Sequence, residues 1–289
     1  MIKKGFLHIG IFFLHLVSFF PMWFLFGIAN ILYYLLYYVV GYRRAVVRKN
    51  LLLSFPEKST AEIIKIEKRF YSNLTDIMVE IVKMSSISKA EVLKRVKMKN
   101  FEVAEAYFKR GESALACTGH YGNWELGMMA AGLKFSAKSN VIYKPINNKV
   151  FENWFNTLRT KFGNIFVPMK QTLRDVVATK HDTTLFCFAS DQSPRGRDAH
   201  HLLTFLNQRT AVLLGLEKIA KQTNRPIFYF DIRRVKRGYY EVECIPMCLN
   251  PKETAPFEIT ELFFEHLTKT IHREPGDWLW SHKRWKIND

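Results

Sequence analysis

The longest uncharged stretch of the chain runs from Gly5 to Tyr42 and contains no Asp, Glu, Lys or Arg. It is far longer than the ~20 residues that a helix needs to cross a bilayer. Pro21 divides the stretch, so a kinked span, a re-entrant hairpin and a span followed by a surface helix all fit. We therefore expect residues 1–42 to form a membrane anchor.

Basic residues flank this stretch on both sides. Lys3 and Lys4 precede it, and a heavier group that begins with Arg43 and Arg44 follows it. Because basic residues concentrate on the cytoplasmic side of spans, the rest of the chain is expected in the cytoplasm. A cleaved signal peptide is the competing interpretation, but no small-residue cleavage signal follows and the hydrophobicity continues past the usual length. An uncleaved anchor fits better.

The net charge of +17 over 289 residues favours anionic partners. Nucleic acid is one class, but the basic residues are scattered and match no nucleic-acid-binding signature. An anionic membrane surface or an acidic substrate agrees better with the uncharged N-terminal stretch. The chain also lacks a Gly-x-Ser-x-Gly elbow, a P-loop and a dinucleotide-binding glycine pattern, which argues against a membrane-attached hydrolase of those types. A non-catalytic, basic, membrane-associated binding protein remains as an alternative.

The four cysteines lie in apolar runs such as "ALACT" and "TLFCFAS". This setting predicts buried, reduced thiols and agrees with a cytoplasmic domain. Cys244 and Cys248 are four residues apart, but no second pair or histidine cluster accompanies them, so no metal site is predicted.

Residues 59–84 predict a long amphipathic helix. Ser59 and Glu62 have the spacing of a capping box. Apolar residues then recur at steps of three and four and form one stripe: Ile63, Ile66, Phe70, Leu74, Ile77 and Ile81. Lys65 and Lys68 belong to the opposite face, which we expect to be solvated.

Beyond Asn100 short apolar runs alternate with helical patterns. Strands are expected at 114–118, 140–144, 183–190 and 226–232, and helices at 101–111, after Asn123, at 150–162 and at 211–222. This order indicates an α/β domain with a parallel or mixed sheet flanked by helices. We assign residues 43–289 to that single domain.

The stretch "TGHYGNWELG" lies where such a fold places its working residues, beyond the carboxyl end of a strand. Asn123 is a good N-cap, so Glu125 falls in the first turn of the next helix and His120 in the loop before it. A loop histidine can turn back to that carboxylate, which would fix its tautomer and leave the other ring nitrogen as a general base. The alternative is a structural loop histidine beside a helix N-terminus.

The same stretch resembles a known family. "HYGNWE" resembles the His-x-x-x-x-Asp/Glu motif of the glycerolipid acyltransferases, in the form found in bacterial lipid A late acyltransferases. Further stretches are similar to that family's later motifs in the same order: "YKPINN", "LRTKFGN", "FASDQSPRG" and "DWLWSHKRWK". The resemblance covers nearly the whole chain and implies the glycerolipid-acyltransferase fold with an N-terminal hydrophobic helix or helical hairpin.

The resemblance implies an O-acyltransferase on the cytoplasmic side of the bacterial inner membrane. His120 would deprotonate an acceptor hydroxyl, Glu125 would orient His120, and the hydroxyl would attack an acyl thioester. The donor would be acyl carrier protein or acyl-coenzyme A, and the acceptor a lipid A precursor, a lysophospholipid or an aminolipid. The resemblance implies no cofactor.

The resemblance also implies further substrate-binding residues. They are Asn123, Lys144, Asn147, Arg159, Asp191 and Gln192. Arg159 and Lys144 would neutralise a phosphate of the acceptor or of the donor's phosphopantetheine. A solvated surface charge is the alternative for Lys144, and a structural turn is the alternative for Asp191 and Gln192.

Two features depart from, or lie outside, the family pattern. Where the family has a Phe-Phe-Gly turn, this chain has Phe205-Leu206-Asn207, which bears on acyl length and acceptor identity. The pair His200-His201 has no counterpart in the motifs and is expected to be structural or exposed. Trp278, Trp280 and Trp285 are expected to pack in the core or lie at the interface.

Overall fold

The computed structural model describes residues 2–194 and 201–285, with side chains from residue 5 onward. Seven strands form one sheet in the order β1-β9-β8-β2-β5-β3-β4. Their bounds are β1 Val96–Lys99, β2 Ala114–Thr118, β3 Lys138–Tyr143, β4 Ile165–Pro168, β5 Thr184–Ala189, β8 Ile227–Lys236 and β9 Tyr239–Cys248. All neighbouring strands are parallel except the β8–β9 hairpin. A separate two-stranded ribbon comprises β6 (Leu202–Phe205) and β7 (Gln208–Ala211).

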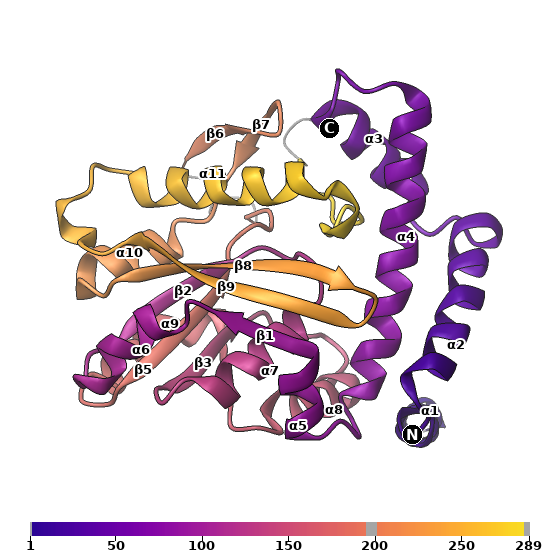
Figure 1. The fold of residues 1–289 in the computed structure, drawn as a ribbon, viewed down its shortest axis with the longest axis horizontal. Coiled ribbons are helices and arrows are strands. Elements are labelled where there is room, and N and C mark those ends of the chain that lie inside the picture. Colours follow the sequence, from indigo (N-terminus) through magenta and orange to yellow (C-terminus); the bar gives the residue numbers. More distant parts are fainter. Residues whose placement is uncertain (1, 195–200, 286–289) are drawn as a thin grey trace.

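Helices flank this sheet (Figure 1). Their bounds are α1 Ile2–Ser18, α2 Met22–Tyr34, α3 Arg44–Ser54, α4 Thr60–Lys83, α5 Lys89–Arg95, α6 Glu102–Lys109, α7 Trp124–Lys134, α8 Lys149–Thr160, α9 Thr172–Ala178, α10 Gly215–Thr223 and α11 Glu258–Arg273. In Figure 1, α11 lies on one side of the β8–β9 hairpin, and α5, α7 and α8 lie on the other. The α/β fold with a mixed sheet is therefore confirmed.

The two central strands, β2 and β5, are apolar because both of their faces are buried. Every residue of β2 is buried, as is all of β5 except its last residue, so both central strands need apolar side chains on both faces. The four cysteines are buried and free, as predicted. The predicted helix at 211–222 begins later than expected, at Gly215, because Ala211 still pairs with Leu202 in the ribbon.

The α4 helix has the predicted capping box. The backbone N–H of Ser59 donates to Glu62 Oε2 over 2.8 Å, and the N–H of Glu62 donates back to Ser59 Oγ over 3.4 Å. Ile63, Phe70 and Ile77 are buried, while Lys65 and Lys68 are exposed as expected. The structure adds a second buried face of α4 that is polar, described below.

The N-terminal stretch folds as two helices broken at Pro21. In Figure 1, α2 runs alongside α4, and α1 is seen end-on at the foot of α2. Met22, Leu25 and Ala29 pack on Val79 of α4. The segment Met22–Val39 is long and apolar enough to cross a membrane, with 18 residues and a mean hydropathy of 1.5, whereas the apolar part of α1, Gly5–Ser18, is shorter. This apolar helix agrees with membrane association.

The turn before α7 makes a specific demand on Gly122. Its φ is +55°, and a Cβ there would lie 3.2 Å from Ile232 Cγ2. Gly127, inside α7, has ordinary helical backbone, and a Cβ there would meet Ile232 Cδ1 at a comfortable 3.5 Å.

We predict opposite effects of alanine at these two glycines. Gly122→Ala should lower the free energy of unfolding by about 1–2 kcal/mol, because an L-residue is strained at positive φ. Gly127→Ala should raise it by roughly 0.5–1 kcal/mol, because it restricts the unfolded chain and fits the helix. Urea denaturation of the two variants in matched detergent measures both. Equal effects would contradict the backbone assignment of this turn.

Candidate active site

The loop between β2 and α7 carries His120 and is held by the C-terminal segment. The carbonyl of His120 accepts from Leu279 N over 3.1 Å, and the N–H of Gly122 donates to Asp277 O over 2.9 Å. Tyr121 and Trp278 form an antiparallel bridge. These backbone contacts fix the loop against a segment more than 150 residues away in the chain.

The structure pairs His120 with Asp191, which follows β5. Nδ1 of His120 lies 2.6 Å from Asp191 Oδ1, and the backbone N–H of His120 donates to Asp191 Oδ2 over 2.9 Å. Asp191 Oδ2 also accepts from Trp278 Nε1 over 2.8 Å. Because β2 and β5 are parallel neighbours, their carboxyl ends bring the two residues together.

The charges of this pair are mutually stabilised. Burial alone would lower the pKa of His120, but the charge and hydrogen bond of Asp191 outweigh it, so the pKa of His120 is raised. Burial would raise the pKa of Asp191, but His120 and the Trp278 N–H lower it to about 2. Asp191 is therefore a carboxylate at any ordinary pH.

The second ring nitrogen of His120 faces Gln192. The two atoms, His120 Nε2 and Gln192 Nε2, lie 3.2 Å apart. When Nδ1–H of the neutral ring donates its hydrogen bond to Asp191, Nε2 carries no proton and is an acceptor. The side-chain amide N–H of Gln192 is then the donor to Nε2. Trp124 packs edge-on against the imidazole at a centroid distance of 5.0 Å. The side chain of His120 keeps 17% of its surface exposed, so Nε2 lies near the surface of the site.

Glu125 has a different partner from the one expected. It lies in the first turn of α7, but its carboxylate pairs with Arg159 of α8: Arg159 Nε donates to Glu125 Oε2 over 2.8 Å, and Nη2 donates to Oε1. Trp124 Nε1 also donates to Glu125 Oε1, over 3.1 Å. The place next to His120 that Glu125 was expected to take is held by Asp191.

Arg159 is fixed by rings as well as by charge. Its guanidinium lies 3.8 Å from the ring centroid of Phe155 and 5.0 Å from that of Phe166. Glu125 and Arg159 both act on the electrostatics of His120, since the first raises its pKa and the second lowers it. The predicted site residues His120, Glu125, Arg159, Asp191 and Gln192 therefore gather at one end of the sheet.

The remaining predicted residues lie at the margin of this group. Asn123 is fully buried: its Oδ1 accepts from Leu126 N as the predicted N-cap, and its Nδ2 donates to Glu80 Oε2 over 2.7 Å. Lys144 and Asn147 are exposed in the segment between β3 and α8.

The three C-terminal tryptophans are buried, as one of the two expectations had it. Their indole N–H groups donate to Asp191, to the carbonyl of Pro275 and to the hydroxyl of Thr210. His200 lies outside the described residues. His201 stacks on Phe257 with ring centroids 4.0 Å apart. In the described part of the chain, no three His, Cys, Asp or Glu side chains cluster as a metal site would require.

One cation near Asp191 could not be anticipated. Arg284 is 2% exposed, and none of its three side-chain nitrogens has a hydrogen-bond partner among residues 2–194 and 201–285. Burial lowers its pKa to about 10, which the charge of Asp191 partly offsets. A buried guanidinium beside the carboxylate helps to keep Asp191 ionised.

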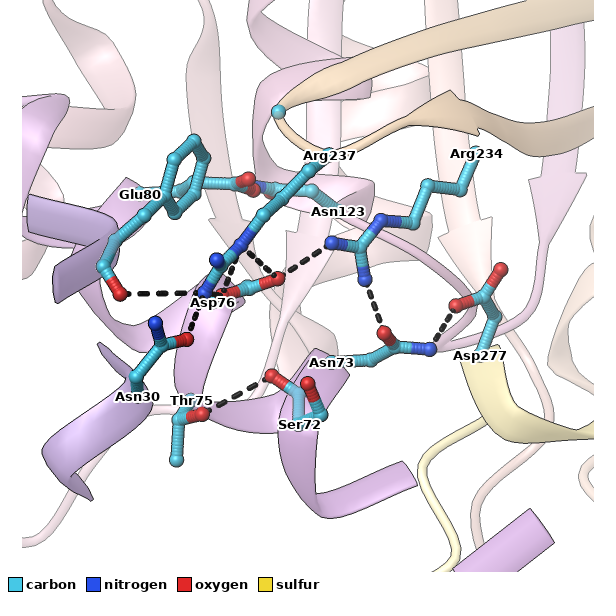
Figure 2. Close-up of polar contacts among 12 residues, drawn as sticks. Asn30, Ser72, Asn73, Thr75, Asp76, Glu80, Asn123, Arg234, Arg237 and Asp277 are labelled. Atoms are coloured by element: carbon cyan, nitrogen blue, oxygen red, sulfur yellow. Dashed lines mark hydrogen bonds and ion pairs between the residues drawn. The ribbon is translucent and has the colours of Figure 1, made fainter. Parts of the chain in front are cut away.

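A polar stripe on α4 also escaped the sequence analysis. Asn73, Asp76 and Glu80 are buried on one face of the helix, and Figure 2 shows them meeting Arg234, Arg237, Asn123 and Asp277. The signal was present in the spacing, because Arg69, Asn73, Asp76 and Glu80 are separated by four, three and four residues. Glu80 Oε2 accepts from Asn123 Nδ2 and from the Tyr240 hydroxyl, so α4 supports the loop that carries His120.

The chain matches a known protein family along nearly its whole length. The model of the bacterial lipid A biosynthesis acyltransferase family matches residues 1–287. The chain belongs to this family. It is similar to a lipid A biosynthesis palmitoleoyltransferase of Escherichia coli K12, with 23% identity over 84% of this chain and 79% of the relative. A lipid A biosynthesis acyltransferase of Shigella flexneri matches with the same identity and coverage.

Family membership makes the chain an acyltransferase enzyme of lipid A biosynthesis. Such an enzyme requires an acyl donor and a lipid acceptor.

The burial of Glu80 generates a prediction about pH and stability. Burial raises the pKa of Glu80 to about 7, against the opposing hydrogen bonds from Asn123 and Tyr240. A raised carboxyl pKa stabilises the fold below the unfolded-state value, and this stabilisation is lost as pH rises through the folded value.

We therefore predict that Glu80→Gln flattens the stability profile between about pH 4.5 and pH 7. Wild type should lose on the order of 1–3 kcal/mol more than the variant across this window. Urea midpoints at a series of pH values measure it, with the exposed Glu265→Gln as the control. Parallel profiles for wild type and Glu80→Gln would show that Glu80 ionises normally in the folded protein.

Proposed function

We propose that this enzyme moves a fatty acyl group from an acyl thioester to a hydroxyl of a lipid A precursor, at the cytoplasmic face of the inner membrane. The observation that carries the proposal is the arrangement of His120, with Nδ1 on a buried carboxylate and Nε2 near the surface of the site. Family membership supports the reaction class, and the apolar α2 supports membrane association.

His120 acts as the general base. Its Nε2 takes the proton of the acceptor hydroxyl while that oxygen attacks the thioester carbonyl carbon. As the tetrahedral intermediate collapses, the carbon–sulfur bond breaks, and the leaving thiolate takes the proton back from His120. The acceptor hydroxyl enters by displacing the amide of Gln192 from Nε2, because the two groups would occupy the same hydrogen-bonding position.

Asp191 is the residue that orients His120 and stabilises its charged form. It holds the proton on Nδ1, so the lone pair of Nε2 faces the substrate. Glu125 acts through Arg159: their two-point pair positions the guanidinium, whose Nη1 has no hydrogen bond within the described residues. That group is the candidate for contact with an anionic part of a substrate.

Other assignments follow from exposure. Lys144 and Asn147, on the exposed segment after β3, are candidates for contact with the phosphopantetheine arm or the acceptor headgroup. Asn123 positions the loop from inside, because both polar atoms of its side chain are already used. Acyl carrier protein and acyl-coenzyme A are both suitable donors, since each carries a phosphorylated pantetheine and suits a chain of net charge +17.

The reaction is tested by assaying the purified full chain in detergent with acyl-acyl carrier protein or acyl-coenzyme A and a lipid A precursor. Mass spectrometry should detect one added acyl group, released by mild base as an ester is. A lysophospholipid and an aminolipid are run in parallel. Transfer to one of these but not to the precursor would reassign the acceptor, and no transfer to any would contradict the proposed function.

We predict that His120→Ala lowers turnover by about 10²–10⁴-fold, the usual contribution of a general base. Asp191→Asn should lose a comparable amount, and the double variant should be little worse than either single variant. Because the Asp191 charge raises the pKa of His120, the acid limb of the residual rate should move to lower pH in Asp191→Asn.

The control for this series is Asp182→Asn, near the opposite end of β5, where Asp182 pairs with the exposed Lys138 over 3.0 Å. It should leave rate and profile unchanged. An Asp191→Asn variant that folds and retains normal turnover would remove Asp191 from the mechanism.

Arg159→Lys tests the role of the guanidinium. The change keeps the charge but loses the fork that meets Glu125, so kcat/KM should fall by at least about tenfold. Arg110→Lys is the matched control, since Arg110 forms a similar pair with Glu112 on the surface. Kinetics like wild type in Arg159→Lys would mean that the guanidinium has no part in the site.

A further inference from the structure

We propose that a basic pocket between α4 and the tip of the β8–β9 hairpin binds the phosphate of a lipid headgroup. The pocket has a volume of about 410 Å³. Its lining residues are Arg69, Ser72, Asn73, Asp76, Arg234, Val235, Lys236 and Arg237. It is separate from His120 and Asp191, and the choice of a lipid rests on the membrane association proposed above.

The arginines of the pocket are held in place by buried partners. Arg234 Nη2 donates to Asp76 Oδ2, and Arg237 Nε lies 3.0 Å from both carboxylate oxygens of Asp76. Arg234 also donates to Asn73, which in turn donates to Asp277 Oδ1 over 2.6 Å. Figure 2 shows both guanidinium groups directed at Asp76. A site held in this way loses little side-chain entropy when an anion binds.

Positive charge exceeds negative charge in the pocket. The lining contains four cations and one carboxylate. Within the described residues, Lys236 forms no ion pair, Arg69 pairs only with Glu274 at 3.2 Å, and Nη1 of Arg237 has no hydrogen bond. A phosphate group binds where N–H donors are available and the local net charge is positive, and this pocket provides both.

The place of the pocket in the fold points to a lipid. Arg237 Nη2 donates to the carbonyl of Phe26 over 3.2 Å and to Asn30 Oδ1 over 2.8 Å, so the hairpin tip touches α2 midway along it. Val235, 55% exposed, projects beside the cations. Trp23 and Ile31 of α2 are exposed apolar residues. Basic pockets beside apolar helices are suited to anionic headgroups.

The test compares binding of two full-length double variants. Arg69→Gln/Lys236→Gln removes two exposed cations of the pocket, and Lys218→Gln/Lys252→Gln removes two exposed cations near the other end of the hairpin. Each protein is titrated with phosphatidylcholine vesicles, with and without phosphatidylglycerol. We expect the pocket variant to lose about 5–30-fold of its affinity for the anionic vesicles only. The control should change little, because neither of its lysines lines the pocket.

A second titration separates a bilayer lipid from the acceptor. A lipid A precursor and its dephosphorylated form are presented in detergent, without any acyl donor. If the pocket variant binds only the phosphorylated precursor more weakly than wild type does, the pocket is assigned to the acceptor phosphate. If it binds only the anionic vesicles more weakly, the pocket is assigned to a phospholipid of the bilayer. The proposal would be overturned if the pocket variant kept wild-type affinity in both titrations. It would also be overturned if the control variant lost as much affinity as the pocket variant. Because neither titration needs acyl transfer, failure of this proposal can be distinguished from failure of the proposed acyl transfer.

Melting curves accompany each titration. Should the double variant melt lower than wild type, Lys236→Gln alone carries the test, because Lys236 is exposed and its ammonium lies over the Tyr239 ring at 4.3 Å without an ion pair among the described residues. A loss of about fivefold for anionic vesicles or for the phosphorylated precursor is then expected.

Discussion

The buried carboxylate of Asp191 holds the parts of the candidate active site together. Asp191 accepts the backbone N–H and the ring nitrogen of His120 and the indole N–H of Trp278. It thereby ties the end of β5 to the loop after β2 and to the C-terminal segment. An isolated buried carboxylate would be costly, so its ionisation depends on these three donors and on the nearby cation Arg284. His120, the proposed general base, is oriented by these contacts.

A second polar network supports the loop from the opposite side. Glu80 of α4 joins Asn123 and Tyr240, and Asn73 joins Asp277, whose carbonyl accepts from Gly122. The same helix packs against α2, which together with the π-helical turn Leu35–Val39 forms the apolar segment long enough to cross a membrane. Helix α4 therefore contacts both the expected anchor and the loop that carries His120. These contacts explain why α4 buries polar side chains on one face in addition to its apolar stripe.

Local signals predicted much of the fold. The buried runs of β2 and β5, the capping box of α4 and the N-cap of α7 all depend on residues within a few positions of one another. Strand β9 was missed because its burial alternates, with charged residues outward, so it lacks a continuous apolar run. The late start of α10 was missed because residues 208–211 join a ribbon through pairing that no local pattern reveals.

The candidate site likewise combines residues that a local motif reveals with partners that are distant in sequence. His120 and Glu125 were recognisable from one short stretch, but their partners were not. Asp191 is 71 residues from His120, and Arg159 is 34 residues from Glu125. Proximity in sequence favoured pairing His120 with Glu125, whereas adjacent parallel strands bring Asp191 to the histidine. The choice of partner is decided by sheet order, which spacing along the chain does not encode.

Asp191 fixes the tautomer of His120 and raises its pKa. Nitrogen-15 NMR of the histidine ring measures both, using full-length protein in detergent and Asp191→Asn for comparison. We expect a proton on Nδ1, an unprotonated Nε2 and a pKa above the usual value of about 6.5 in wild type, with the pKa falling in the variant. A proton on Nε2 of the neutral ring, or a pKa that Asp191→Asn leaves unchanged, would contradict it.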